Sequence, residues 1–338
     1  MMRLLLLCFL LALQGDFSRH NEDSNPVEAI LDAIETHRIV ALGENHGHAE
    51  LHSLILKTLA TKRAAKSLDD IVVEWGNSLY QPEIDRYISG ESVPWDSVAL
   101  AWRNAVVSPN TVWDSEVYAD FFRGVREING SLNPENKFRV LLADSPIDWD
   151  AIESREDVAP FFDRAASMAD ILRKESLLKG RNSLFLAGGL HVSKRARTHE
   201  NRLGIPFSEI TPIAWVEFKN PGVTFVIQSM GQANRLNLPE LTTEGEPKFI
   251  ALGSNGPFRS ILASSTSNLK NRDGTRPDVY PGLVLGDIID AVIVWDQETV
   301  TFLEPKPDLY DDEVFWNELN RRSQIMRGGP MDESLRER

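Results

Sequence analysis

The sequence has few cysteines and little positive charge, and each shortage excludes a class of chemistry. Its only cysteine among 338 residues is Cys8, inside an apolar N-terminal run at 4–13. Once that run is removed, disulfides, thiolate nucleophiles and cysteine metal ligands are excluded. Lysine and arginine total 36 against 50 acidic residues, giving a formal net charge of −14. We therefore expect no nucleic-acid partner, because an acidic surface repels phosphates.

Long apolar segments and the usual serine-nucleophile motif are also missing. The run at 4–13 follows Arg3 and is too short to span a bilayer, so it predicts a secretory signal peptide over residues 1–15. No later segment is apolar enough for a stable membrane span after its cleavage. The sequence therefore predicts an exported protein, periplasmic or extracellular. A Gly-x-Ser-x-Gly motif is absent, which argues against a serine nucleophile of the α/β-hydrolase type.

What the chain does contain is a regular alternation of apolar runs and helical patterns. Strands rich in Val, Ile and Leu are expected at 38–44, 70–76, 138–146, 182–191, 222–231 and 290–304. Helical spacing occurs at 26–37, 48–66, 115–129 and 158–180. This pattern predicts an α/β fold with a mostly parallel central sheet, helices on both faces and a helical cap insertion.

The same pattern predicts one large domain. We expect it to cover 26–306, with the helical cap at about 77–130, because the tryptophan-bearing stretch there is longer than a normal connection. A C-terminal helix and a mobile tail are expected over 307–338. The sequence does not predict the oligomeric state.

Reactive side chains follow the predicted strands where each strand ends. The first strand ends in GENH (43–46), the fourth in GGLH (188–191), and the second carries Glu74. Asp144 ends the third strand in the same way. In an open parallel sheet, ligands bind beyond the carboxyl ends of the strands. We therefore expect two Gly-x-x-His turns and one buried glutamate to meet in a single crevice.

The candidate catalytic residues are Glu44, His46, Glu74, His191 and Arg103. His46 suits a general base near neutral pH, with Glu44 or Glu74 orienting it. Alternatively, His46, Glu74 and His191 are candidate ligands of a divalent metal that would activate water. Arg103 is a candidate for stabilising an oxyanion.

Each candidate also has a purely structural alternative. A polar residue that ends a buried strand often only caps the next helix. Buried Glu74 needs a partner to stay ionised, whether Arg103, His46 or a metal. His48 and His52 lie four residues apart on a predicted helix, where they form either a metal-binding pair or part of a solvated face.

These motifs resemble the haem-uptake/Tiki superfamily, and in particular its ChaN-like proteins. The resemblance rests on the two Gly-x-x-His turns, on "EWGNSLYQPEIDRYISGE" and on "AGGLHVSKRARTHENRLGIP", and it covers about 38–215. Erythromycin esterases are similar more distantly, and "GDIIDAVIVWDQETVT" resembles their closing strand. Two features depart from the esterase pattern. Glu44 and His46 are two apart rather than three, and Ile55, with Lys57 nearby, stands where an arginine is expected.

The resemblance implies that Glu44, His46, Glu74 and His191 form the site. It implies metal-dependent peptidase activity from the Tiki members, lactone hydrolysis from the esterases, or haem binding from the ChaN-like members, and fold alone does not choose among these. We favour an exported hydrolase of ester or peptide bonds that acts on a small molecule or peptide, with or without the assistance of a metal. A non-catalytic haem- or metal-binding uptake protein is the alternative.

Overall fold

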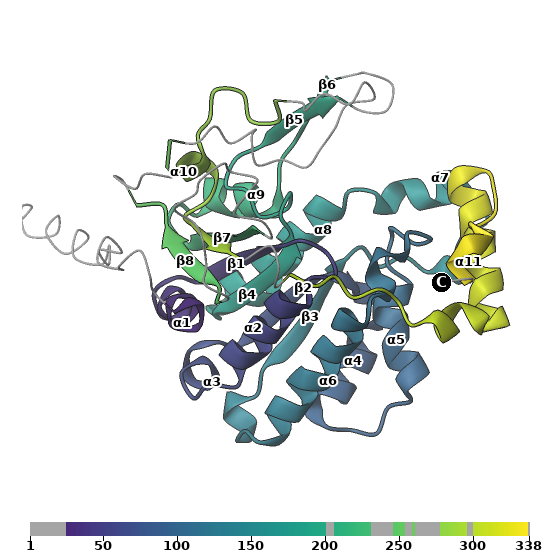
Figure 1. Ribbon diagram of the computed structural model, residues 1–338, viewed down its shortest axis with the longest axis horizontal. Coiled ribbons are helices and arrows are strands. Elements are labelled where there is room, and N and C mark those ends of the chain that lie inside the picture. The colour runs from purple at the N-terminus through teal and green to yellow at the C-terminus, as the bar shows by residue number, and fades with distance from the viewer. Residues whose placement is uncertain are drawn as a thin grey trace, which may run out of the picture.

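One mostly parallel sheet forms the centre of the molecule (Figure 1). The computed structural model describes residues 25–200, 206–230, 246–253, 259–260, 278–295 and 300–336. Within them, seven strands are ordered β3-β2-β4-β1-β7-β9-β8. Their bounds are β1 Ile39–Glu44, β2 Asp70–Asn77, β3 Arg139–Asp144, β4 Ser183–Gly188, β7 Thr224–Met230, β8 Lys248–Ala251 and β9 Ala291–Val294. Only β8 is antiparallel to its neighbour.

Helices cover both faces of this sheet, as the sequence predicts (Figure 1). The longer ones are α1 Pro26–Thr36, α2 Ala49–Leu59, α4 Gln81–Ser89, α5 Trp95–Arg103, α6 Glu116–Gly130, α8 Arg164–Ile171, α9 Pro212–Lys219 and α11 Glu313–Arg327. Short ones are α3 Ala64–Ser67, α7 Arg155–Val158 and α10 Leu285–Ile288. A small hairpin of β5 Arg197–Glu200 and β6 Pro206–Glu209 stands apart from the sheet.

The pleat of each strand divides its side chains between two apolar cores. On β1, Val40 and Leu42 belong to the core shared with α1, α2, α4, α5 and α6. Ile39 and Ala41 face the opposite core, with α8, α9 and α10. Because successive strand residues point to opposite faces, a strand buried on both sides must be apolar throughout. The continuous apolar run of β1 therefore explains its central position, and the expected fold class is confirmed.

The segment at 77–130, expected as a helical cap, contains α4, α5 and α6. Val98 and Trp102 of α5, like Phe121 and Phe122 of α6, are buried in the same core as the sheet. Trp102 stacks on Phe122 with ring centroids 5.2 Å apart. These helices are thus a structural layer of the domain that packs against the sheet.

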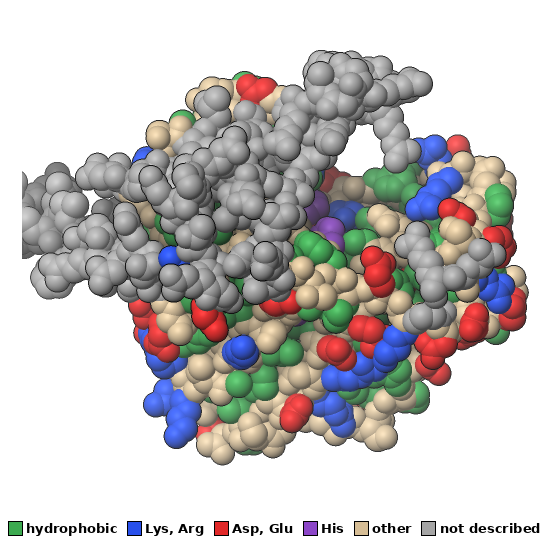
Figure 2. Space-filling model, in the orientation of Figure 1, with side chains coloured by type: hydrophobic (Ala, Val, Ile, Leu, Met, Phe, Trp, Pro, Cys, Tyr) green, Lys and Arg blue, Asp and Glu red, His purple; other side chains and the backbone are tan. Residues whose placement is uncertain are grey.

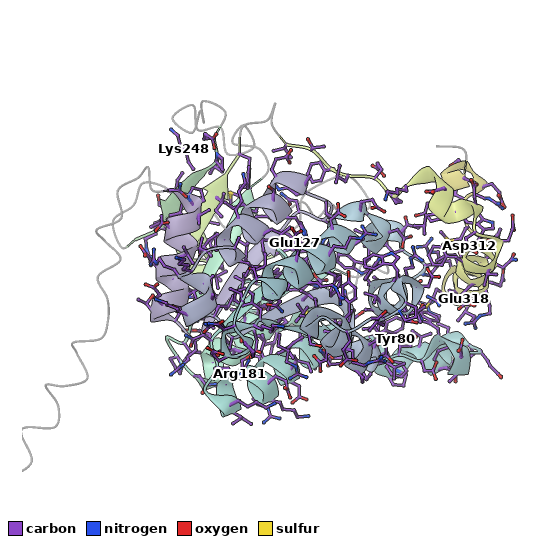
Figure 3. All side chains as sticks on the ribbon, turned by 90° about the horizontal axis from the view of Figure 1, so that it is seen from below. Tyr80, Glu127, Arg181, Lys248, Asp312 and Glu318 are labelled. Atoms are coloured by element: carbon purple, nitrogen blue, oxygen red, sulfur yellow. The ribbon has the colours of Figure 1, made fainter. Side chains whose placement is uncertain are left out.

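The C-terminal segment crosses the molecule and ends on α11. Residues 300–304, expected to continue a strand, form only an isolated bridge from Phe302 to His48, and β9 ends at Val294. Residues 328–336 fold back on α11, where Met331 is buried and its N–H donates to Asn320. Figure 3 shows Asp312 and Glu318 at this end of the molecule.

Two expectations concern the membrane and export. No helix within the described ranges is long and apolar enough to cross a bilayer. The predicted signal peptide at residues 1–15 lies outside the described residues.

Candidate functional site

The strand order brings the two Gly-x-x-His turns together. Strand β4 lies between β1 and β2, and Glu44, the last residue of β1, is directly opposite Gly188, the last residue of β4. Glu74 approaches Gly188 from the other side, and its Oε2 accepts the Gly188 N–H at 2.5 Å. The chain therefore places a buried acid on each side of a glycine at the carboxyl edge of the sheet, where parallel sheets bind ligands.

Glu44 is buried and accepts three hydrogen bonds. Its Oε1 accepts from His46 Nδ1 at 2.7 Å and from the Tyr118 hydroxyl at 3.0 Å, while Oε2 accepts from His52 Nε2 at 2.8 Å. Burial alone would raise the pKa of Glu44, but the hydrogen bonds from His46 and His52 outweigh it and lower the pKa to about 2. Glu44 is therefore a carboxylate at all physiological pH values.

His46 is fixed at one nitrogen and open at the other. Its Nδ1–H is used on Glu44, so Nε2 is the unprotonated nitrogen of the neutral ring. The ring packs edge-on against Trp113 at 4.5 Å, and its side chain is 34% exposed. Burial lowers the pKa of His46, but the hydrogen bond to Glu44 and the charges of Glu44 and Glu74 more than compensate and raise it. This is the arrangement of a general base held by a carboxylate.

Glu74 is the centre of a second polar cluster. Its Oε1 lies 3.2 Å from His191 Nε2 and 3.2 Å from Arg164 Nη1. Arg164 also donates through Nε to Asp144 at 2.6 Å, and Asp144 accepts the Val106 N–H at 2.8 Å. Burial raises the pKa of Glu74, but His191, Arg164 and His46 outweigh burial and hold it well below its usual value. Arg164 thus pairs with two buried acids at once.

His46 and His191, which are far apart in the sequence, meet over one sheet edge with Glu74 between them. A Cβ built on Gly188 would lie 3.0 Å from His46 Nε2 and 3.3 Å from Glu74 Oε2. Figure 2 shows histidine side chains at the edge of a hollow in this face, in the region where α8 lies in Figure 1. The structure therefore brings together Glu44, His46, Glu74 and His191, as the sequence predicts.

The close approach around Gly188 yields a prediction. Gly188→Ala is expected to displace the His46 ring, because the added methyl would come 2.8 Å from His46 Cε1. Overpacking of this kind costs about 1–3 kcal/mol of unfolding free energy. Urea denaturation measures that loss, and imidazole NMR signals report the ring. Gly90→Ala is not a suitable control because Gly90 has φ 114°. Gly130→Ala is suitable, since nothing lies within 4 Å of its added Cβ.

Arg103 is not part of this cluster. Its guanidinium lies over the Phe315 ring at 5.0 Å, and no hydrogen bond joins it to Glu44 or Glu74 within the described residues. The expectation that Arg103 stabilises an oxyanion here has no contact to support it. Arg103 ends α5, which turns it toward α11, and Arg164 of α8 supplies the cation instead.

Sequence reasoning missed three residues of the site. Arg164, His52 and Tyr118 come from α8, α2 and α6, so no local motif joins them to the strand ends. The available signal for Arg164 was indirect, because the strand-end acids Glu74 and Asp144 each require a counter-charge. His52 was expected either in a metal pair or on a solvated face. It is buried against Glu44 instead.

The residues present do not fit a metal. No group of three or more His, Cys, Asp or Glu side chains within the described part of the chain has a geometry that could hold one. His191 Nε2 points at Glu74 itself, and the Arg164 guanidinium already neutralises Glu74. A divalent cation bound to Glu74 would be repelled by that guanidinium. The candidate metal ligands His46, Glu74 and His191 therefore have a charge arrangement unsuited to a cation.

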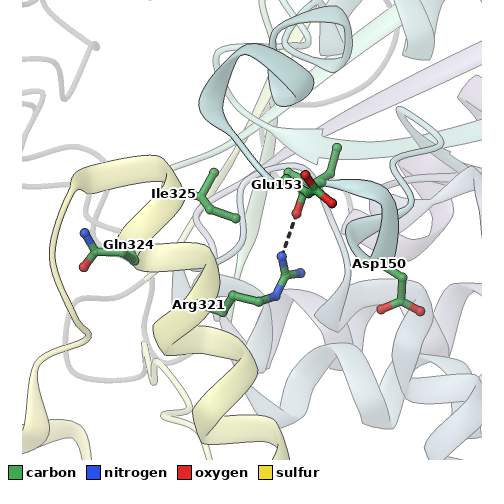
Figure 4. Close-up of a pocket in the computed structure, with 6 residues that line it drawn as sticks. Asp150, Glu153, Arg321, Gln324 and Ile325 are labelled. Carbon is green, nitrogen blue, oxygen red and sulfur yellow. Dashed lines mark hydrogen bonds between the residues drawn. The ribbon is translucent and has the colours of Figure 1, made fainter.

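A separate cavity of about 510 Å³ lies beside α11 (Figure 4). It is lined by Asp150, Ile152, Glu153, Arg321, Gln324 and Ile325. Its cation, Arg321, is fully used, donating to the Ile152 carbonyl at 2.7 Å and pairing with Glu318 at 2.7 Å. None of these lining residues belongs to the Glu44–Glu74 site.

Comparison with known proteins shows the fold. No family model matches the chain, and no curated protein matches its sequence. Among solved structures, an erythromycin esterase, EreC, in its open conformation matches with a TM-score of 0.54 and 9% identity, over 82% of this chain and 94% of that one. A protein described as a succinoglycan biosynthesis protein matches with a TM-score of 0.53 and 9% identity, over 81% and 94%. The fold is thus similar to that of the esterase, as expected.

The match to a ChaN protein is weaker. The haem-bound ChaN of Campylobacter jejuni overlaps 61% of this chain and 86% of its own, at 15% identity and a TM-score of 0.39. An overlap at that score supports no inference about this chain. Identities this low show only that the folds are similar, so any chemistry has to be argued from the residues of the site.

Proposed function

We propose that this chain, which has a fold similar to that of an erythromycin esterase, is a hydrolase of an ester or peptide bond. The observation that carries the proposal is the Glu44–His46 contact at 2.7 Å, which uses Nδ1 and leaves Nε2 of a 34% exposed side chain for chemistry at the carboxyl edge of the sheet. A small molecule or a peptide is the proposed substrate.

Hydrolysis would proceed with His46 as the proton carrier. Nε2 accepts a proton from water while the water oxygen attacks the carbonyl carbon. Glu44 stabilises the imidazolium that forms, as a buried carboxylate does for a catalytic histidine. The imidazolium then returns the proton to the departing alkoxide or amine as the bond to carbon breaks. Arg164 and His191 both contact Glu74. They offset the negative charge of Glu74, which would otherwise repel a developing oxyanion.

The reaction has a predicted pH dependence. Because the pKa of His46 is raised above 6.5, the neutral base is lost on the acid side at a higher pH than for an ordinary histidine. We expect kcat/KM to rise with pH along a limb whose apparent pKa exceeds 6.5. Initial rates between pH 5 and 9 on a chromogenic ester measure it. A rate that falls as pH rises through this range would make His46 an acid and contradict the assignment.

The direct test is a hydrolysis screen of the purified chain against ester, lactone and peptide panels, with and without chelator. Activity that chelator leaves unchanged and that His46 substitutions remove supports the proposal. Haem binding is the alternative to be excluded. A Soret band on addition of haemin, lost when His46 is replaced and unaccompanied by hydrolysis, would replace the hydrolase assignment.

We also propose that the protein is exported. The proposal rests on the apolar run at 4–13 alone. Mass spectrometry of protein recovered from outside the cytoplasm would show a mature N-terminus near residue 16, whereas an intact Met1 would contradict export.

A further inference from the structure

The carboxylate that holds His46 has a second histidine on its far side. His52 lies in the second turn of α2 and is 3% exposed. Its Nε2 approaches Glu44 Oε2 at 2.8 Å, and its buried Nδ1 has no hydrogen-bond partner among the residues that the structure describes. Because a carboxylate can only accept, the proton of a neutral His52 ring resides on Nε2. His52 is therefore a donor directed at Glu44.

The two carboxylate oxygens of Glu44 accept different numbers of hydrogen bonds. Oε1 receives both His46 and the Tyr118 hydroxyl, whereas His52 is the donor that Oε2 receives within the described residues. Burial and the Glu44 charge raise the pKa of Tyr118 well above its usual value, so its hydroxyl remains a donor. Without His52, Oε2 would be a buried charged oxygen with no partner, and the carboxylate would gain freedom to rotate.

The His52 ring is itself held rigidly by aromatic side chains. It lies 5.5 Å from Trp75, 5.3 Å from Tyr118 at 90° and 6.3 Å from Phe121. Packing of this kind fixes both ring torsions, so the Nε2–H points at one place. Because the His52 ring is held in place, its hydrogen bond also holds the Glu44 carboxylate in place.

We propose that His52 is a positioning residue of this site: by anchoring Oε2 of Glu44 it fixes the Oε1 that orients His46. Only the kinetic consequence of this inference rests on the proposed hydrolase function. The orienting effect on the His46 ring does not depend on any substrate. The charged and titratable groups that face this assembly are Glu74 from β2, Arg164 from α8, Tyr118 from α6 and His48 from the turn before α2.

His52→Leu and His52→Gln separate positioning from simple packing. Leucine removes the donor, whereas glutamine restores an N–H at similar reach. In the Leu variant we expect kcat to fall about 10-fold to 100-fold with KM little changed, because small misplacements of a base have effects of that size. The Gln variant should recover most of kcat. Imidazole nitrogen shifts should show one His46 tautomer in the wild type and Gln variant, and a mixture in the Leu variant.

His48→Leu is the matched control. His48, which directly precedes α2, is also buried, and burial lowers its pKa to about 4. Within the described residues its ring nitrogens make no hydrogen bond, and Nε2 lies 3.4 Å from Glu50 rather than near Glu44. Its replacement should leave kcat and the His46 signals unchanged. If His52→Leu does not fold, His52→Asn, whose amide is too short to reach Oε2, takes its place with the same expected result.

The outcomes distinguish the two proposals. A His46 tautomer that shifts only in the Leu or Asn variant, in a protein without hydrolytic activity, supports positioning and refutes the hydrolase. Hydrolysis that continues with unchanged kcat and an unchanged tautomer in those variants refutes positioning and leaves the hydrolase intact. Equal losses in the Leu and Gln variants would mean packing rather than a donor, and would also overturn the inference.

Discussion

His46→Asn is expected to reduce kcat about 100-fold to 10,000-fold, the range that a general base contributes. Asparagine keeps a polar side chain that can donate to Glu44, so the buried carboxylate retains a partner. It has no basic nitrogen to take a proton from water. The expected loss is therefore in chemistry, with KM and the unfolding midpoint nearly unchanged. Steady-state rates on the ester found in the screen, together with thermal unfolding, measure both quantities.

His37→Asn serves as the control for that experiment. His37 follows α1 and its Nδ1 interacts with the Ala33 carbonyl and the Thr36 hydroxyl, at the end of β1 opposite to Glu44. Its substitution should leave kcat within twofold. A His46→Asn protein that retains more than one tenth of wild-type kcat would show that another group activates the water, and the Glu44–His46 assignment would fail.

The main elements of the fold follow from apolar patterning. Strands β1, β2 and β4 are buried on both faces, so apart from Glu74 and the polar residues at their ends they are mostly apolar, and a Val/Ile/Leu run marks such strands clearly. The predicted helix at 48–66 was less accurate, since the structure divides it into α2 and α3. Its apolar spacing continues through the break, and periodicity alone does not detect a turn of that kind.

The same contrast explains which parts of the site could be predicted. Glu44, His46 and His191 are attached to strand ends, and the carboxyl ends of parallel strands lie at one edge of the sheet, so their meeting followed from the fold class. Arg164 and His52 lie on helices, and the direction of a helical side chain depends on how its helix packs. Arg103 illustrates the same limit. It was predicted to be the cation of the site, but α5 directs its guanidinium to Phe315.

Arg164→Met is expected to lower the unfolding free energy at pH 7 by about 3–5 kcal/mol, the range for removing one partner of a buried ion pair. Arg164 is the cation that contacts both Glu74 and Asp144, whose side chains are 2% and 0% exposed. Methionine fills much of the arginine's volume, so the loss reports charge rather than a cavity. Arg63→Met is the matched control. Like Arg164, Arg63 pairs with more than one acid, and it contacts three. Its side chain is 36% exposed, so the expected loss of unfolding free energy is below about 1 kcal/mol.

The pH dependence of that loss identifies its cause. In the wild type, burial raises the pKa of Glu74, but His191, Arg164 and His46 hold it well below 4.5. Glu74 therefore adds stability above its unfolded pKa, and that stability is lost as the pH falls through the folded pKa. Removing Arg164 raises the folded pKa of Glu74, so the deficit should be greatest near neutrality and shrink as the pH falls toward about 4. Urea titrations of both proteins from pH 4 to 8 measure it. A deficit constant across that range would mean that Arg164 contributes packing, and the second polar cluster would then not be held together by charge.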